Sequence, residues 1–517
     1  MTVHYKNPIV TGMHPDPSIV LVEGSYYLVN STFEYYPGIS LSRSTDLVNW
    51  EKMDSILTKH SQANLRKAKS NEGIFAVCIR YHKGHFYIVT TNFAEWKNFI
   101  IRGKLSPDKE QIIWEEKRIE IDIMGIDPDL YFEDQRTYVQ FTGYIDDEGT
   151  KAIQQVEIDL ISGKILRGPE VLSFGTGGRD VEGPHIIKKE NHYYLLAAEG
   201  GTGIGHMITM FRSPHLWGPY ESAPQNPLFT NRDRANQLLQ NIGHADLFQD
   251  KSGNWWLTCL GTRPTSLDFI QFTNTGRETL LYPVNWDTEW PQIYHGIPTV
   301  EVDLTDFPHH AKEIGQQTEK ILEDSFISSH LHPEWISLRD SLRERLTVGD
   351  GLLCLSGSTS TLTDLATPSF LGLRQTDQEE TFQIKLDIEH TSIKDGAIGI
   401  ATLINSDHYA CLLIRKNEIA GYDFIKQIRI LDIEVTEKLG TLPYLPQMLS
   451  IEHGKKEKIF RAISNKKENI VFSCHSLHFS NEAIAALNTG NISGIYVLDD
   501  ACLAITQAKR FSSHTLC

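Results

Sequence analysis

Apolar and polar residues follow one recurring pattern over the first 298 residues of the chain. Each of five copies has a polar motif, four or five apolar residues, a tight turn, and an aromatic residue that opens a second apolar stretch. The aromatic positions lie 60, 52, 55 and 62 residues apart, at Tyr26, Phe86, Tyr138, Tyr193 and Trp255. Alternation of this kind is typical of strands, and the repeat length suits a four-stranded sheet with its loops. The pattern predicts a five-bladed β-propeller over residues 1–298.

The pattern changes after residue 298. Residues 299–323 are mostly polar and lack the aromatic repeat, so we expect a linker there. From residue 324 to residue 517, short strand-like segments alternate with charged or Gly, Asn and Asp turns at intervals of about 8 to 15 residues, which favours a β-sandwich. We therefore expect an all-β chain, with a propeller followed by a concanavalin-like sandwich.

Length and charge limit the function classes. A chain of 517 residues exceeds what one hydrophobic core usually spans, which agrees with two domains. With 49 basic and 66 acidic residues, the net charge of −17 repels phosphate backbones and anionic membrane surfaces. We expect neither nucleic acid nor a membrane as a partner, and the sequence leaves a homo-oligomer open.

The cysteines and the N-terminal segment bear on the compartment. Seven cysteines are scattered without CxxC spacing, an odd number for a disulfide framework. The first residues contain no apolar signal region, and no uncharged apolar stretch is long enough to span a bilayer. We expect a cytoplasmic protein.

Four polar residues stand at nearly the same place in their repeats, 10 or 11 residues before the aromatic position: Asp16, Asp127, Glu182 and His244. Pseudo-symmetry should bring them together around the propeller axis. A cluster of carboxyl groups of this kind can hydrolyse an acetal, with one group as acid and another as base.

Each carboxylate also has a simpler interpretation. Asp16 and Asp127 both precede a proline, which forces an extended backbone, and a single Asp-Pro favours a rigid strand entry. Two Asp-Pro motifs at matching positions in their repeats favour a functional role for the aspartates. Glu182 follows a glycine-rich segment that presents it at a strand start, where crowding by Asp127 and partial burial would raise its pKa; the alternative is a solvated loop glutamate.

Other residues remain open between roles. His244 could orient a carboxylate, hold a cation at the axis, or be a hydrogen-bonded core histidine. Arg277, between Gly276 and an apolar strand, could bind neighbouring hydroxyl groups or form a salt bridge between blades. Phe33 could form the floor of a sugar pocket or belong to the core. The glycine-rich segment 200–205 precedes a strand pattern and not a helix, which excludes a dinucleotide loop.

Several motifs together resemble glycoside hydrolase family 43, in particular its β-xylosidases and α-L-arabinofuranosidases with a C-terminal concanavalin-like β-sandwich. The motifs are NPIVTGMHPDPSIV, STFEYYPGISLSRSTDLVNWE, IRYHKGHFYIVTTN, DPDLYF, EGPHIIKKENHYYL, GHADLFQ and GRETLLYPVNWD. The resemblance is strong over residues 5–295 and weaker afterwards. It implies a five-bladed propeller and single-step hydrolysis that inverts the anomeric centre.

The resemblance also implies a role for each carboxylate. Asp16 is the general base that deprotonates water, and Glu182 is the general acid that protonates the leaving oxygen. Asp127 is the third carboxylate, which raises the pKa of the acid and holds it in place.

By the same resemblance, Arg277 contacts sugar hydroxyls, Phe33 shapes that subsite, and His244 lies at the propeller axis, where several relatives hold calcium. The chain departs from the family pattern in blade two. Residues 73–77 are GIFAV where the family usually has GIWAP, so that Phe75 takes the place of a tryptophan on the leaving-group side.

The sequence therefore predicts an exo-acting glycosidase that releases D-xylose from the non-reducing ends of β-1,4-xylo-oligosaccharides. An α-L-arabinofuranosidase, or an enzyme with both activities, is the alternative. A third possibility is a sugar-binding propeller without turnover, but the three carboxylates at matching positions argue against it. No cofactor is required by this chemistry, and calcium at the axis stays open.

Overall fold

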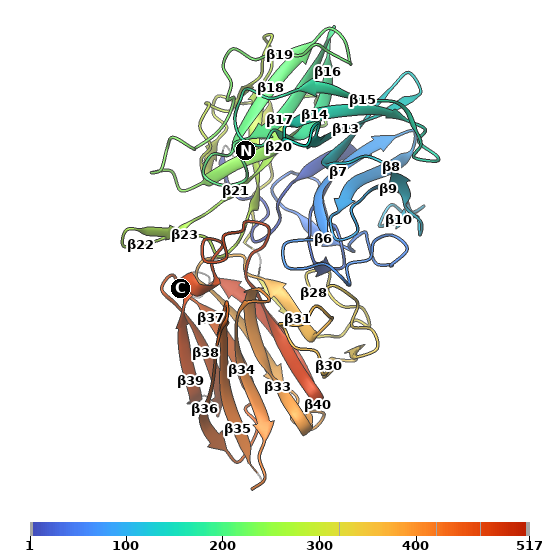
Figure 1. Cartoon of the computed structure of the whole chain (residues 1–517). Helices are drawn as coiled ribbons and strands as arrows, with labels where there is room; N and C mark the ends of the chain where they lie inside the picture. Colours follow the sequence, from blue (N-terminus) through green and yellow to red (C-terminus); the bar gives the residue numbers. More distant parts are fainter. Residues whose placement is uncertain (1–3, 320, 420, 466, 513–517) are drawn as a thin grey trace.

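The computed structural model describes residues 4–512 except 320, 420 and 466, so Cys517 and the last residues of the expected sandwich lie outside it. Strands β1 to β40 make up nearly all of the regular structure in this part, with two short 3-10 segments, η1 (His310–Lys312) and η2 (Ser476–Phe479). The chain forms an upper and a lower half (Figure 1). No helix among the described residues is long and apolar enough to cross a membrane.

The upper half is a propeller of five antiparallel sheets, as predicted. The first blade consists of β2 (Ser18–Val22), β3 (Ser25–Asn30), β5 (Ser40–Ser44) and β6 (Glu51–Met53), and the second of β7 (Ile74–His82), β8 (His85–Asn92), β9 (Lys97–Leu105) and β10 (Ile112–Trp114), with β11 (Ile119–Ile121) also paired to β9. The third blade consists of β12 (Ile126–Glu133), β13 (Arg136–Tyr144), β14 (Lys151–Ile158) and β15 (Ile165–Ser173), and the fourth of β16 (Glu182–Lys189), β17 (His192–Glu199), β18 (Met207–Ser213) and β19 (Glu221–Ser222). The fifth blade consists of β20 (Gln240–Gln249), β21 (Trp255–Thr262), β24 (Glu278–Asn285) and β25 (Gln292–Ile293).

The repeated aromatic residues pack between neighbouring blades. Tyr26 meets Phe248 of the fifth blade edge-on at 6.0 Å between ring centroids, and its neighbour Tyr27 meets Phe86 of the second blade at 5.1 Å. The first strands of the blades, β2, β7, β12, β16 and β20, contact one another in a closed ring. Burial of these rings between sheets explains why the sequence repeats them, since each aromatic side chain removes a large apolar area from water.

The ends of the propeller are joined by backbone pairing. Strand β1 (His4–Lys6) pairs with β26 (Glu301–Asp303), and the amides of Ile9 and Val10 donate to the carbonyl of Thr279 in β24. After β26 the chain stays on the propeller, where Leu304, Phe307, Ala311 and Ile314 are buried in its core. The segment expected to be a linker therefore carries apolar side chains that pack on the propeller.

The lower half is a β-sandwich, as predicted. Its strands are β27 (Leu322–Asp324), β29 (Leu346–Gly349), β30 (Leu352–Ser356), β31 (Ser369–Arg374), β32 (Glu380–Leu386), β33 (Ser392–Asn405), β34 (His408–Lys416), β35 (Tyr422–Ile430), β36 (Ile433–Leu442), β37 (Met448–His453), β38 (Glu457–Ser464), β39 (Lys467–His475) and β40 (Ile492–Ser512). The 21-residue strand β40 pairs first with β33 and then with β32. One strand thus belongs to both layers.

The two halves share an interface and an apolar cluster. Strand β4 (Tyr35–Tyr36), in the first blade, pairs with β28 (Ser337–Leu338) of the lower half. Met13 and Tyr35 lie in one buried cluster with side chains of the sandwich. The side chain of Asn274 donates to two carbonyls of the sandwich, at 3.0 and 2.7 Å. These contacts bring the loop 481–491, which precedes β40, against the propeller.

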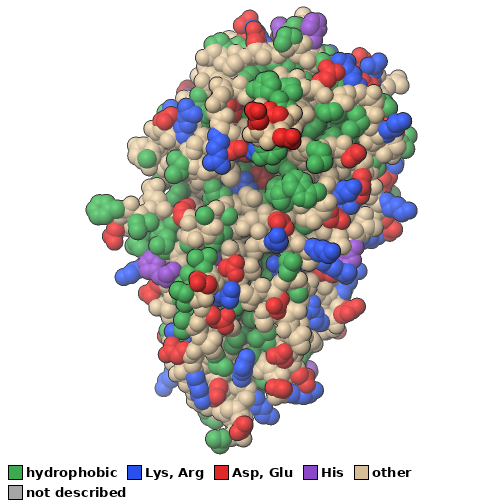
Figure 2. All heavy atoms as spheres, viewed as in Figure 1, with side chains coloured by type: hydrophobic (Ala, Val, Ile, Leu, Met, Phe, Trp, Pro, Cys, Tyr) green, Lys and Arg blue, Asp and Glu red, His purple; other side chains and the backbone are tan. Residues whose placement is uncertain are grey.

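A small hairpin, β22 (Thr265–Leu267) and β23 (Ile270–Phe272), projects from the fifth blade (Figure 1). Figure 2 shows that charged side chains of both signs cover both halves, with hydrophobic side chains among them on the upper half. The negative net charge is therefore spread over the surface on this face.

Candidate active site

A repeated β-bulge places the predicted residues at the mouth of the propeller axis. In the pairing of β12 with β13, Ile126 and Asp129 each have a partner residue, and Asp127 between them lies in the bulge and is not paired. The same irregularity surrounds His244 in β20. Asp16, Asp127 and His244 all have positive φ, of 51, 55 and 46°, so the extended backbone expected for the two aspartates ahead of proline is wrong. Such angles are uncommon outside glycine, and bulges of this type re-aim side chains at the rims of closed sheets.

Glu182 does not occupy the same position as Asp127. It is the first paired residue of β16, the place of Ile126 in β12, and Gly183, with a φ of 58°, corresponds to Asp127. The amide of Gly183 donates to Asp127 Oδ2 at 3.2 Å. A Cβ atom on Gly183 would lie 3.0 Å from His244 Nδ1. The glycine therefore lets three neighbouring blades approach one another at this point.

Asp16 is buried beside one cation, Arg277, and beside hydrogen-bond donors. Arg277 Nη1 lies 3.2 Å from Asp16 Oδ1, and His244 Nδ1 lies 4.0 Å from the same oxygen. The hydroxyl of Ser31 donates to Asp16 Oδ2. Burial alone would raise the pKa of Asp16, but Arg277, His244 and Ser31 together lower it below the ordinary value. Asp16 is therefore ionised at neutral pH, as a base must be.

Arg277 is held from three sides. Its Nη1 donates to the Thr202 hydroxyl at 3.1 Å, and its Nε and Nη2 donate to the Leu487 carbonyl and to Asn488 Oδ1 at 2.9 and 3.1 Å. The guanidinium carbon lies 5.6 Å from the centre of the buried Phe33 ring. The sandwich thus contributes directly to the site, and the turn 200–205, which the sequence excluded as a nucleotide loop, supplies one of the partners.

The acid side of the site favours protonated carboxyl groups. Burial raises the pKa of Glu182 to about 7, with Lys151 acting against the shift and Asp180 adding to it. Burial, the charge of Glu182 and the charge of Asp16 raise the pKa of Asp127 well above its ordinary value. Lys151 Nζ and Asp180 Oδ1 form an ion pair of 2.6 Å beside this group. A carboxyl group with a pKa near neutrality can deliver a proton at working pH.

A buried glutamate fixes the loop that presents Glu182. Glu199 accepts hydrogen bonds from the amides of Thr176 and Gly178, at 3.0 and 3.2 Å, and from the Thr209 hydroxyl at 2.8 Å. A Cβ atom on Gly175 or Gly178 would come within 2.9 Å of the Glu199 carboxylate. The glycines before Glu182 are therefore needed for close approach to Glu199.

The remaining predicted residues lie around the same mouth. Phe75 is half-buried, with its ring 5.6 Å from Phe33 and stacked on Phe93 at 4.5 Å. Burial lowers the pKa of His244 to about 4, so its imidazole is neutral at neutral pH. Its nearest ionic neighbour is Asp16, and its ring meets His185 edge-on at 6.4 Å. The structure brings all seven predicted residues to one region through these contacts and the Gly183 bridge.

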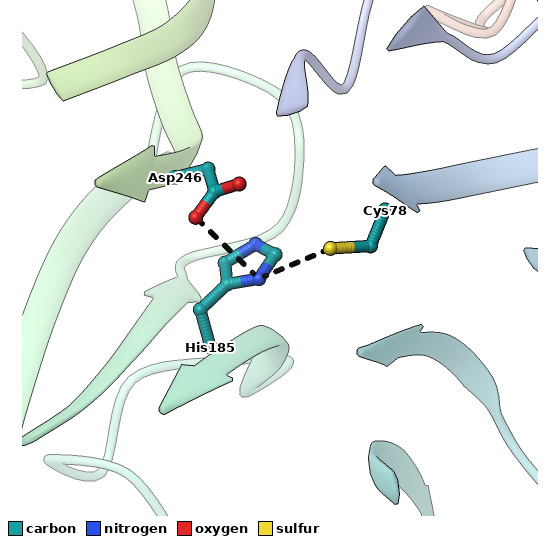
Figure 3. A group of neighbouring side chains, drawn as sticks. All are labelled: Cys78, His185 and Asp246. Carbon is teal, nitrogen blue, oxygen red and sulfur yellow. Dashed lines mark hydrogen bonds and ion pairs between the residues drawn. The ribbon is translucent and has the colours of Figure 1, made fainter. Parts of the chain in front are cut away.

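The propeller axis itself holds an arginine. Donor atoms of Cys78, His185 and Asp246 lie within 4.8 Å of one another (Figure 3). Arg80 lies among them, with Nη1 2.7 Å from Asp246 Oδ2 and Nη2 2.8 Å from Asp129 Oδ2 and 3.0 Å from His185 Nδ1. Calcium requires six or more oxygen ligands. The axis residues do not fit it, because a guanidinium already neutralises both carboxylates, and the remaining donors are a thiol and an imidazole.

Several contributors were not found from the sequence. Leu487 and Asn488 lie 210 and 211 residues from Arg277, and no local pattern connects them. Arg80 stands in a strand pattern where an arginine ordinarily faces solvent. Ser31 alone had a signal, because it precedes Phe33 in the motif that the sequence singled out.

Comparisons with known proteins identify the family of the chain. The family model of glycosyl hydrolases family 43 matches residues 5–291, and that of the β-xylosidase C-terminal concanavalin A-like domain matches residues 323–505. The chain is 31% identical to a non-reducing end α-L-arabinofuranosidase of Bacteroides ovatus, over 95% of this chain and 91% of that protein. It is 34% identical to a xylosidase/arabinosidase of Butyrivibrio fibrisolvens, over 80% of each chain. A crystal structure of xylan β-1,4-xylosidase from Bacillus halodurans superposes with a TM-score of 0.84 at 26% identity, covering 98% of this chain and 99% of that one.

Proposed function

The chain belongs to glycosyl hydrolase family 43, and from this premise we propose that it releases D-xylose from the non-reducing ends of β-1,4-xylo-oligosaccharides. It is a glycosidase; the sugar, the linkage and the stereochemistry are the proposal. The observation that carries the hydrolytic mechanism is the different setting of two carboxyl groups in one site: Arg277 Nη1 lies 3.2 Å from Asp16 Oδ1 and lowers the pKa of Asp16, whereas burial raises the pKa of Glu182. Paired groups whose environments separate their pKa values in this way mark the base and the acid.

In the proposed reaction, Asp16 accepts a proton from water while that water attacks the anomeric carbon. Arg277 keeps Asp16 ionised and presents its remaining N–H surface toward sugar hydroxyls. Glu182 donates its proton to the glycosidic oxygen as the bond to the leaving group breaks. Asp127 accepts a hydrogen bond from the Gly183 amide and so holds the start of β16 in place. Because water attacks opposite the leaving group in a single step, the product has inverted configuration.

α-L-Arabinofuranosidase activity is the second candidate. The Bacteroides ovatus relative carries that name, and the Butyrivibrio fibrisolvens relative carries both. The two pentoses present related hydroxyl groups to Arg277 and the carboxylates, so the same machinery serves either.

The test is a matched pair of nitrophenyl glycosides, the β-D-xylopyranoside and the α-L-arabinofuranoside, together with xylobiose. We expect the highest kcat/KM on the xyloside and release of xylose from xylobiose. Proton NMR of the first product formed should show the α-anomer of xylose. A higher kcat/KM on the arabinofuranoside would reverse the sugar assignment, and β-xylose as first product would exclude inversion. Absence of turnover on all three would favour a binding protein.

We also propose that the enzyme works in the cytoplasm without a metal ion. The scattered cysteines support a reducing compartment: Cys78, Cys259, Cys411 and Cys474 are buried as free thiols. Arg80 supports independence from cations, because it supplies the positive charge at the axis. Cell fractionation followed by a xylosidase assay would test the location.

A further inference from the structure

Four aromatic rings form a continuous row from the candidate active site to the surface. The row begins at Phe33, over which Arg277 lies, and continues through Phe75 and Phe93 to Trp96. Successive ring centroids are 5.6, 4.5 and 4.3 Å apart. Phe33 is 2% exposed, Phe75 and Phe93 are half-buried, and Trp96 is 61% exposed. The row therefore leads outward from the site of reaction.

Backbone and side-chain contacts make this row rigid. The amide of Phe93 donates to the carbonyl of Gly73 at 2.7 Å, which fixes the turn between β8 and β9 against the segment before β7. Within that turn, Glu95 accepts from Asn92 Nδ2 at 2.7 Å and from Arg118 Nη1 at 2.6 Å. The turn that carries Trp96 is thus anchored to two neighbouring segments.

Trp96 occupies a costly position for its type. Its φ is 51°, in the left-handed region, where a bulky residue is an outlier. Its large apolar ring is left mostly in water, although the adjacent Phe93 packs inward. A strained backbone that holds an exposed aromatic ring beside a pocket is a feature expected of a binding surface.

The chemistry of the occupant follows from where the row begins. An exo-acting glycosidase encloses the terminal sugar, so the rest of the chain must leave the pocket along its wall. Pyranose rings have apolar C–H faces that pack on flat aromatic rings, and their hydroxyl rims stay in water. An exposed tryptophan, with its apolar body and polar N–H, fits such a ligand.

We propose that Trp96 is a stacking platform for a leaving-group sugar beyond the one next to the cleaved bond. Phe75 and Phe93 act as its support, since the Phe93 ring covers one face of Phe75. This inference rests on the proposed exo-glycosidase function and assigns it a preference for chains longer than a disaccharide.

The experiment compares Trp96→Ala with wild type on xylotetraose and on nitrophenyl β-xyloside. We expect the ratio of kcat/KM on xylotetraose to kcat/KM on the aryl xyloside to fall about 3- to 10-fold, mainly through KM, as loss of one aromatic contact would give. Trp96→Tyr, which keeps a ring, should recover most of the ratio. In the Asp16→Ala background, calorimetry should show the same weakening of xylotetraose binding when Trp96 is replaced.

Phe269→Ala is the matched control, because Phe269 is a fully exposed aromatic at the tip of the β22–β23 hairpin and outside the row. It should leave the ratio unchanged. If Trp96→Ala left the ratio of the two kcat/KM values unchanged, or lowered both values equally, Trp96 would not be a stacking platform. Turnover of the aryl xyloside would in that case still support the proposed glycosidase function. If wild type hydrolysed neither substrate, the proposed function itself would fall.

Discussion

The base side of the site, around the proposed base Asp16, and the acid side, around the proposed acid Glu182, differ in what surrounds each carboxyl group and in which part of the chain holds it. Asp16 lies against Arg277, and Arg277 is fixed by Leu487 and Asn488 of the sandwich. Glu182 lies among carboxylates and is presented by propeller loops alone, through Gly183 and Glu199. Similar side chains in one mouth therefore acquire opposite ionisation, and the sandwich is needed for only one of them.

This contrast separates two ways of shifting a pKa. On the base side a nearby cation and a hydroxyl donor outweigh burial, and the pKa of Asp16 falls. On the acid side burial acts with like charge, and the pKa of Asp127 rises. The following experiments weaken one side at a time.

Removal of the base should have the largest effect. We expect Asp16→Ala to lose more than about 10⁴-fold in kcat on every substrate, because no other carboxylate among the described residues lies against Arg277 at that place. Initial rates on xylobiose and nitrophenyl xyloside measure the loss, and an unchanged melting temperature shows that folding is intact. A loss confined to one substrate would contradict the role of base.

Removal of the acid should depend on the leaving group. Glu182→Ala should lose about 10² to 10⁴-fold on xylobiose, which needs protonation, and much less on a dinitrophenyl xyloside, which does not. The ratio of the two kcat/KM values is the measurement. Equal losses on both substrates would show that Glu182 does not protonate the leaving oxygen.

The like charge on the acid side can be removed with Asp180→Asn, because Asp180 is the carboxylate that adds to the raised pKa of Glu182. Activity falls above neutral pH as Glu182, with a pKa of about 7, loses its proton. Without a negative neighbour Glu182 should lose that proton at lower pH, so the alkaline limb of kcat/KM should move downward. A pH profile measures this, and an unmoved limb would leave burial as the cause of the raised pKa of Glu182.

The cation on the base side can be loosened from the sandwich with Asn488→Ala. Arg277 loses one anchor, so the pKa of Asp16 should rise toward its ordinary value and the acidic limb of kcat/KM should move upward. We expect a loss of about 2- to 10-fold near neutral pH, the size of one hydrogen bond. Asn417→Ala, in the turn after β34, is the matched control on the sandwich and should leave both limbs in place.

The axis below both sides should be insensitive to cations. Treatment with a chelator, and calcium added afterwards, should change neither the activity nor the melting temperature, because Arg80 supplies the charge between Asp129 and Asp246. A specific ion bound to the native state would raise the melting temperature. A rise on adding calcium would therefore show that a cation binds despite Arg80.

Features that repeat along the chain, and motifs whose residues are close in the sequence, could be predicted from the sequence. The aromatic period identified five blades because each ring is buried between sheets, as Tyr26 and Tyr27 show. The Asp-Pro motifs identified Asp16 and Asp127 because both stand where a strand begins. The equivalence of Glu182 was one residue out, because in the hairpin register Tyr193 corresponds to Thr137 and Gly183 takes the place of Asp127.

What the sequence could not give depends on residues far apart in the chain. Arg277 and Asn488 meet only because β4 and β28 join the two halves. Arg80 points to the axis because its strand is the innermost of its blade, and strand periodicity alone does not distinguish the axis from solvent. For His244 the sequence offered a metal, a carboxylate or a core role, and the structure places it beside Asp16.

The contact between Arg277 and the loop before β40 also orders events during synthesis. A ribosome delivers the propeller with its three carboxylates long before residues 487 and 488 emerge, and β40 must then pair with β33 and β32 to seat that loop. Until that loop is seated, Arg277 lacks two of its anchors and Asp16 lacks a fixed counter-charge. On the proposed mechanism, full turnover therefore requires both domains to be folded.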